Sequence, residues 1–278
     1  MIALKLKRNE SFSIRDGWID KAINSLNDEK NIFYKNDGIT ILGIGANMVK
    51  SLKYWLSASN IIAGKDNNLT DFGKLIYRYD RYLEEAFTWY LIHYYLCSNF
   101  DSNPVFYSFF NNINISNITK KELVEFLIDL YTSNGYTFNE KSLEDDVSVL
   151  LKTYSITNLG DNPEDNYNCP LSNLRLLSER RNKYTKEKTK LSSINYLIVF
   201  FALQNLYEDK FDIIESMSVE CSPCKIFNLD KNSFYQMIEE MKNDDLIVVN
   251  KTAGLNTVYF KTRLTLSDIF EKFYGGDK

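Results

Sequence analysis

The segment from Leu42 to Ile62, LGIGANMVKSLKYWLSASNII, constrains the fold of this chain more than any other stretch. Its small residues Gly43, Gly45 and Ala46 predict a tight turn, and a helix is expected from Asn47 to about Ser59. Apolar side chains recur along one side of this helix at amphipathic spacing: Met48, Leu52, Trp55 and Leu56. This arrangement is typical of the second half of a helix-turn-helix.

The other side of the same helix is expected to carry hydrogen-bonding and cationic side chains: Asn47, Lys50, Ser51, Lys53 and Tyr54. Side chains of these types reach phosphates and base edges in a DNA groove. The polar stretch 63–68 fits the hairpin tip of a winged helix, where Lys65 and Asn67 would contact phosphate or the minor groove. We therefore expect DNA binding. The alternative is a helix-turn-helix used only for protein contact, with solvated lysines.

Hydrophobic periodicity along the chain predicts a mainly α-helical protein in three parts. Residues 1–78 are expected to form a winged helix-turn-helix domain, 79–210 a helical domain, and 211–278 a small α+β unit that is also winged-helix-like. Further helices are expected at 18–26, 79–97, 119–132, 142–154, 191–207 and 230–243, and short strands at 2–6, 246–249 and 258–261. Asp16 stands at the expected N-cap of the first helix, and Thr119 with Glu122 forms a capping box.

The charge balance requires any contact with DNA to be local. The net charge is −4, so the chain is not a general binder of polyanions. A basic run spans 180–190, and its Arg180, Arg181 and Lys183 are expected to contact the DNA backbone. An acidic stretch from Glu140 to Asp165 opposes this run.

Several features together predict a cytoplasmic protein. The N-terminus lacks a charged start followed by an apolar run, so no signal peptide is expected. The longest apolar stretch, 196–203, is too short to span a bilayer and is expected to be a buried helix, so no membrane contact is expected. The four cysteines form no recognisable disulfide framework, which fits a reducing compartment.

Seven segments, taken in order, resemble a bacterial family of formerly uncharacterised domains whose best-known type is SspB. They are ESFxxRxGWxxK at 10–21, LGIGANMVKSLKYWL at 42–56, DxYLE at 80–84, WYLIHYYL at 89–96, SLEDDVSVLLKTY at 142–154, EDNYNCPL at 164–171 and SPCKIFNLD at 222–230. The resemblance covers nearly the full length, and the ordered set is more specific than any single segment.

The resemblance implies a cytoplasmic, DNA-acting component of a phosphorothioation-type modification and anti-phage defence system. In that family the SspB type is the nicking component, which implies partner proteins that supply and insert sulfur: a cysteine desulfurase, an ATPase and a sulfurtransferase. This chain departs from the family pattern at one position, since Asn9 stands where a histidine precedes the Glu-Ser/Thr-Phe motif. If that histidine is catalytic, nicking is impaired in this chain.

A metal-dependent nuclease needs two or three carboxylates around Mg²⁺ or Mn²⁺. This chain offers Asp146 on a predicted helix, and Glu164 with Asp165 on the following loop. The alternative is that Asp146 anchors a loop by accepting backbone hydrogen bonds, while the other two carboxylates are solvated. The sequence therefore leaves open a nicking endonuclease, and a non-catalytic DNA-binding adaptor or transcriptional regulator.

Two further candidates are weaker. The only histidine, His93, lies in an aromatic helix and is expected to be a hydrogen-bonded core residue rather than a general base. The CSPC motif at 221–224 has no second Cys-x-x-Cys to complete a metal site, so its thiols are expected to be buried or incidental. The sequence contains no P-loop, dinucleotide fingerprint or serine-hydrolase motif.

Overall fold

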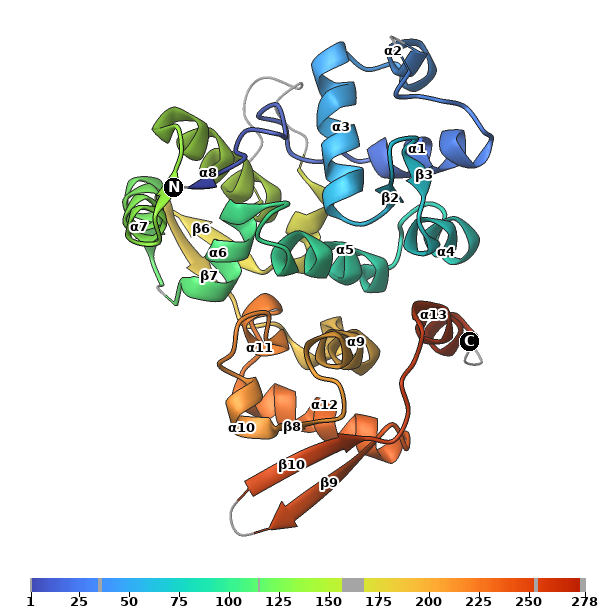
Figure 1. Ribbon diagram of the computed structural model, residues 1–278, viewed down its shortest axis with the longest axis vertical. Coiled ribbons are helices and arrows are strands. Elements are labelled where there is room, and N and C mark those ends of the chain that lie inside the picture. Colours follow the sequence, from blue (N-terminus) through green and yellow to red (C-terminus); the bar gives the residue numbers. More distant parts are fainter. Residues whose placement is uncertain (1, 35–36, 115, 157–167, 253–254, 276–278) are drawn as a thin grey trace.

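The computed structural model describes residues 2–34, 37–114, 116–156, 168–252 and 255–275, and Figure 1 shows how their helices and strands are arranged. The protein is mainly α-helical, with 54% helix and 12% strand, which confirms the predicted class. The strands form small two-stranded and three-stranded sheets. Within the described ranges, no helix has both the length and the apolar character needed to cross a membrane.

The first part of the chain carries β1 (Ile2–Ala3), α1 (Trp18–Asn27), α2 (Asp37–Leu42), α3 (Ala46–Ala58), β2 (Ile62–Ala63), β3 (Asn68–Leu69) and α4 (Asp71–Tyr79). The helices predicted at 18–26 and 47–59 are confirmed as α1 and α3. Gly43 has φ +66° in the turn before α3, a conformation that glycine adopts without strain. Thr70 caps α4 by accepting a hydrogen bond from the Gly73 backbone N–H at 3.1 Å.

The middle part carries α5 (Ala86–Ser98), α6 (Pro104–Asn112), β4 (Ile118–Thr119), α7 (Lys120–Ser133), β5 (Tyr136–Thr137), α8 (Glu140–Tyr154), η2 (Pro170–Leu174), β6 (Leu177–Arg180) and β7 (Lys183–Lys186). The prediction of one helix over 79–97 is wrong at its start, because α4 ends at Tyr79 and α5 begins at Ala86. The Asp80 carboxylate accepts hydrogen bonds from the backbone N–H groups of Glu84 at 2.9 Å and Glu85 at 3.4 Å, which stabilises the break. The capping box of Thr119 and Glu122 is confirmed.

The last part carries η3 (Leu191–Ser193), α9 (Tyr196–Leu206), β8 (Lys210–Asp212), α10 (Ile213–Ser216), α11 (Pro223–Ile226), α12 (Lys231–Asn243), β9 (Ile247–Thr252), β10 (Leu255–Phe260) and α13 (Leu266–Tyr274). The helix predicted at 191–207 begins later than expected, because the Asn195 side chain caps α9 by accepting from the Leu197 N–H at 2.9 Å. In the sheet, β10 pairs antiparallel with both β8 and β9.

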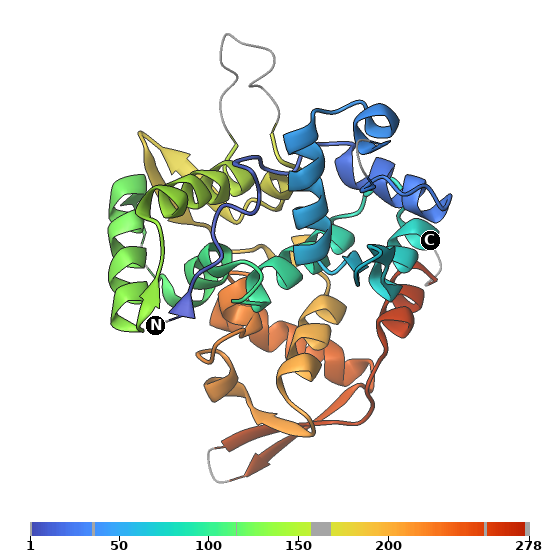
Figure 2. The same cartoon turned by 45° about the horizontal axis from the view of Figure 1, so that its top comes forward.

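The α3 helix is held in the core by its apolar side. Leu52, Trp55 and Leu56 are all fully buried. The Trp55 indole N–H donates a hydrogen bond to the Phe12 carbonyl oxygen at 2.9 Å. The N-terminal segment 4–17 therefore runs along α3, and Figure 2 shows it passing between α3 and α8.

The α13 helix packs back onto the first half of the chain, against α4 and α5 (Figure 1). Phe270 is fully buried, and its ring centroid lies 6.2 Å from that of Phe72 and 5.6 Å from that of Phe87. The hydroxyl oxygens of Thr88 and Tyr274 lie 3.2 Å apart. Aromatic packing thus joins segments that are distant in the sequence.

Candidate nucleic-acid interface

The exposed side of α3 carries Asn47, Lys50 and Lys53, which we call the α3 face. All three side chains are exposed, and the two lysines lie three residues apart, on one side of the helix. Within the described part of the chain, neither lysine has a carboxylate at ion-pair distance. The N-cap of α3 is Gly45, with no side-chain cap, so the first backbone N–H groups have no side-chain acceptor at this end. The α3 face thus presents cations and hydrogen-bond donors together.

The prediction that Ser51 and Tyr54 lie on this same exposed side is wrong, because both are buried, with exposed fractions of 0% and 8%. The Ser51 hydroxyl donates to the Phe12 carbonyl oxygen at 3.4 Å. The Tyr54 hydroxyl donates to the Ser102 carbonyl oxygen at 3.1 Å, and burial raises the pKa of this phenol well above its usual value. These two residues position α3 and do not reach solvent.

The hairpin tip after α3 carries the other two side chains predicted in this region. Strands β2 and β3 pair antiparallel, with Ile62 opposite Leu69. Lys65 is exposed, and Asn67 is half-buried with φ +56°. The Asn67 side-chain amide donates to the Lys65 carbonyl oxygen at 3.4 Å, which ties the tip together.

The basic residues Arg180, Arg181 and Lys183 lie at the turn between β6 and β7, and all three are exposed. Arg181 has φ +54° and its neighbour Asn182 has φ +60°, the backbone of a tight two-residue hairpin turn. This hairpin pairs with β4 and contacts α8, whereas α3 packs on α1 and α2. The structure thus places the two predicted basic regions on different sides of α8 (Figure 1).

Asp146 is buried and anchors the N-terminal segment. One carboxylate oxygen accepts from the Lys7 backbone N–H at 2.8 Å, and the other accepts from the Asn9 side-chain amide at 2.7 Å. Burial raises the pKa of Asp146 to about 6, although the bonds from Lys7 and Asn9 oppose this shift. Lys7, Glu10 and Ser11 all have positive φ, so this segment is strained where Asp146 holds it. These contacts match the anchoring role weighed for Asp146 from the sequence.

A nuclease metal site was predicted from Asp146, Glu164 and Asp165. Glu164 and Asp165 lie outside the described residues. Both oxygens of Asp146 accept hydrogen bonds from protein donors, and the Lys7 ammonium is ion-paired with Asp145 at 2.7 Å. Among the residues that the structure describes, no three metal-ligating side chains gather. The described residues therefore do not fit a magnesium or manganese ion at this place.

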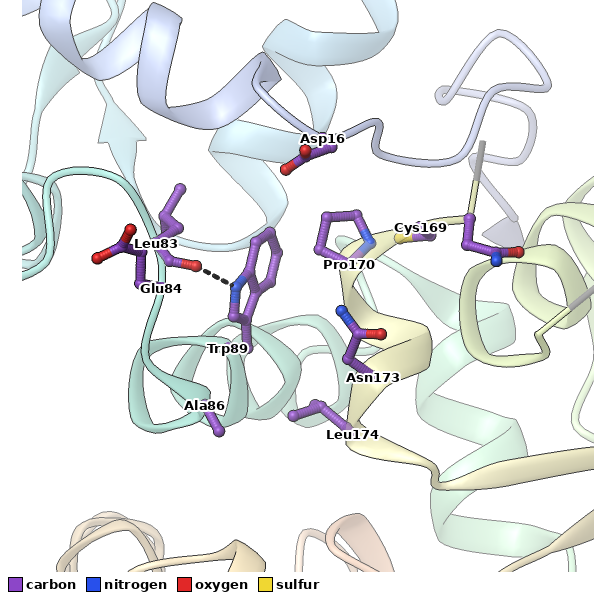
Figure 3. A pocket seen from close by; sticks show the side chains of 10 residues that line it. Asp16, Leu83, Glu84, Ala86, Trp89, Cys169, Pro170, Asn173 and Leu174 are labelled. Atoms are coloured by element: carbon purple, nitrogen blue, oxygen red, sulfur yellow. Dashed lines mark hydrogen bonds between the residues drawn. The ribbon is translucent and has the colours of Figure 1, made fainter. Parts of the chain in front are cut away.

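A pocket of about 340 Å³ lies where the segment before α1 meets α5 and η2 (Figure 3). Asp16, Glu84 and Asn173 give it polar walls, and the Trp89 indole lies beside them with its N–H bonded to the Leu83 carbonyl oxygen at 2.9 Å. The prediction that Asp16 caps α1 is wrong, because the N-cap is Gly17, with φ +74° and no side-chain cap. Sequence reasoning missed this pocket because its walls come from segments far apart in the chain.

His93 is fully buried in the core, as predicted. Its Nε2–H donates to the Ile226 carbonyl oxygen at 2.8 Å, so its Nδ1 accepts from the Tyr154 hydroxyl at 2.6 Å. Burial lowers the pKa of His93 to about 4, which keeps the ring neutral near pH 7. The thiols of Cys221 and Cys224 are half-buried and free, and burial raises the pKa of both.

Comparisons with known proteins identify relatives of this fold. Residues 6–274 match the model of a family described as protein of unknown function (DUF4007). A search of the curated proteins finds no match. Two solved structures are similar: a magnesium ion-bound SspB crystal structure, with a TM-score of 0.83 and 20% identity, and an SspB crystal structure, with a TM-score of 0.80 and 19% identity. Each covers 98% of this chain and 88% of the SspB chain. The predicted likeness to SspB is thus confirmed as a likeness of fold.

Proposed function

Because the chain belongs to the DUF4007 family and shares the fold of SspB, we propose that it is a DNA-binding component of a phosphorothioation-type DNA modification system. The seven sequence segments that resemble the SspB type support this assignment, and so does the likeness of fold over 98% of the chain. Its partners would be the desulfurase, ATPase and sulfurtransferase of such a system.

The α3 face is the observation that carries the proposal. Its lysines stand on a helix whose opposite side is buried, and the Trp55 and Tyr54 side chains bond this helix to two other segments. A recognition helix must be held rigidly if its side chains are to meet phosphates at fixed positions. We assign Asn47 to base or phosphate contact, and Lys50 with Lys53 to phosphate contact.

The β2–β3 tip completes this interface as its wing. Lys65 is exposed at the tip and the hairpin follows α3 directly, so it can reach the backbone next to the groove that α3 enters. The β6–β7 hairpin, with Arg180, Arg181 and Lys183, adds backbone contacts from the other side of α8. A duplex that engages both regions would cross over α8 and the N-terminal segment.

Salt-dependent DNA binding tests the proposal. In Lys50→Ala/Lys53→Ala, affinity for duplex DNA should fall, and the slope of log K against log salt should decrease by up to about 2, because each lost phosphate contact removes about 0.9. The matched control is Lys210→Ala/Lys242→Ala, which removes the same charge from exposed positions on β8 and α12, in the last part of the chain and away from both proposed contact regions (Figure 1). Equal losses in the two variants would refute DNA binding by the α3 face.

Nicking needs a separate test, because Asp146 is engaged as an anchor. We assign no catalytic step to the described residues, which do not assemble a metal site. Incubation of the protein with supercoiled plasmid and Mg²⁺ or Mn²⁺ tests for nicking. Relaxation by the wild type that is lost in Glu164→Ala/Asp165→Ala would establish a nicking activity, whereas an intact plasmid favours a binding role.

A non-catalytic adaptor is the second candidate, and the anchoring of Asp146 favours it. The carboxylate that the sequence offered for catalysis instead fixes the segment that packs on α3. In this case the protein would recruit partner enzymes to DNA. Genes for sulfur-transfer enzymes beside this one would favour modification, and a lone gene with its own operator would favour regulation of transcription.

A further inference from the structure

A cavity of about 630 Å³ lies between the middle part of the chain and the last part, well away from α3. Its walls come from the C-terminal end of α6, the residues after β7, the end of α10, and α11 with the start of α12. This volume is in the range of small-molecule sites. We call it the basic cavity because four lysines line it: Lys186, Lys188, Lys225 and Lys231.

Lys186 forms the inner wall of the basic cavity. Its ammonium donates to the Phe110 carbonyl oxygen at 3.2 Å and to the Ile113 carbonyl oxygen at 2.8 Å. It also lies 4.9 Å from the centre of the Phe109 ring. Burial lowers the pKa of Lys186 to about 7, and the nearby Lys225 contributes to this shift. The Lys186 ammonium caps the C-terminal end of α6 through these two hydrogen bonds. Its cationic form has no carboxylate at ion-pair distance among the described residues, so an anion bound in the cavity would stabilise the charged ammonium.

The charge of the basic cavity is only partly offset by the protein, since the attraction of Lys188 contributes to the lowered pKa of Asp230. Within the described residues, none of the four lysines has a carboxylate at ion-pair distance. Glu187 is the acidic residue in the lining, and its carboxylate accepts a hydrogen bond from the Ser178 hydroxyl on β6. In a chain of net charge −4, this concentration of lysines without a carboxylate at ion-pair distance around a concave surface favours an anionic ligand.

The other walls limit the size and chemistry of that ligand. Met217, Leu229 and Phe110 provide apolar surface, and Asn114 and Asn228 provide side-chain amides. Lysines as point charges suit phosphate oxygens, while apolar and amide surface suits the remainder of a nucleotide. Sulfate-sized ions alone would leave most of the volume unfilled.

We propose that the basic cavity binds the phosphate group of a nucleotide-sized ligand, with Lys188, Lys225 and Lys231 as the contacts to the phosphate oxygens. Free nucleotides and the phosphorylated end of a nucleic-acid strand share this chemistry. Lys186 supplies positive charge from the inner wall. The proposal does not rest on DNA binding by α3, because the two surfaces have no residue in common.

Calorimetric titration with AMP, and with a short single-stranded oligonucleotide with or without a 5′-phosphate, tests the proposal. Lys188→Gln/Lys225→Gln should weaken the phosphate-dependent binding about tenfold or more, because charge-assisted hydrogen bonds are lost. The matched control, Lys120→Gln/Lys121→Gln, removes equal charge from α7 and should bind as the wild type does. If the double variant does not fold, Lys231→Gln, at an exposed position, replaces it.

The outcomes separate the two sources of phosphate. Binding of AMP that the double variant loses would support a free nucleotide as the ligand. A preference for the 5′-phosphorylated strand, lost in the same variant, would support a strand end. The proposal is overturned if the wild type binds neither AMP nor the 5′-phosphate, or if the control variant loses as much affinity as the double variant. DNA binding that depends on Lys50 and Lys53 would be unaffected in either case.

Discussion

Replacing Asp146 with asparagine should remove a contribution to the free energy of unfolding that decreases as the pH rises. In the folded protein burial raises the pKa of Asp146 to about 6. In the unfolded chain an aspartate titrates near 3.9. Between these values the folded state binds a proton that the unfolded state does not, so the stability due to this group is greatest below about pH 4 and falls as the pH rises through about 6.

The size of the effect follows from the difference between the two pKa values. A shift of about 2 units corresponds to about 3 kcal/mol in the free energy of unfolding. The side chain is buried, so solvent screening reduces this figure little. Asparagine is neutral at every pH, and any hydrogen bond that it fails to make with Lys7 or Asn9 costs the same at pH 4 and pH 7. That cost cancels when the two pH values are compared.

Urea unfolding, followed by tryptophan fluorescence between pH 4 and 7, measures this effect. The free energy of unfolding of Asp146→Asn minus that of the wild type should rise by about 2 kcal/mol over this range, because the unfolded aspartate is already about half ionised at pH 4. Taking the difference removes the opposite contributions of carboxylates with lowered pKa, such as Asp230. Asp145→Asn is the comparison variant: it should reduce the dependence only in part, because burial, and not the charge of Asp145, is the largest cause of the raised pKa of Asp146. A difference that stays constant with pH would refute the burial argument for Asp146.

Two further substitutions test the packing. Gly73→Ala should lower the free energy of unfolding by about 1–3 kcal/mol, because a Cβ atom would lie 2.4 Å from the Ile61 carbonyl oxygen. In Gly45→Ala the Cβ meets nothing within 4 Å, so the cost should be below about 1 kcal/mol and come only from the poorer N-cap of α3. Phe270→Ala should cost about 3–5 kcal/mol through loss of a fully buried ring, whereas Tyr82→Ala, at an exposed position, should change stability by less than about 0.5 kcal/mol. Both pairs are compared by urea unfolding, and equal effects within a pair would contradict the packing described.

The sequence predicted those parts of the fold that depend on neighbours in the chain. The bounds of α3 follow from the glycines before it and from apolar residues at helical spacing, and both were visible in the sequence. The capping box at Thr119 is likewise local. The β6–β7 hairpin was missed, because Asn182 at the turn was a local signal but the flanking segments LSER and KYTK show no alternation of apolar and polar residues.

Contacts between residues far apart in the sequence determine the features that were not predicted. Ser51 and Tyr54 look solvent-facing on a helical projection, but the carbonyl groups of Phe12 and Ser102 bond to them from other segments. Asp146 looked like a catalytic candidate because acidic residues follow it, yet its partners are Lys7 and Asn9, which are more than 130 residues away. Periodicity gives the direction of a side chain and not the segment that will cover it.

The position of α13 also affects the order in which the chain can fold during synthesis. Thr88 and Tyr274, whose hydroxyl groups meet, are 186 residues apart. At translation rates of roughly 5–20 residues per second, α4 and α5 leave the ribosome roughly 10–40 s before the helix that covers them. During that interval Phe72 and Phe87 lack their final neighbour Phe270. Until α13 emerges, the nascent first half therefore lacks the helix that covers the aromatic side chains of Phe72 and Phe87 in the folded protein.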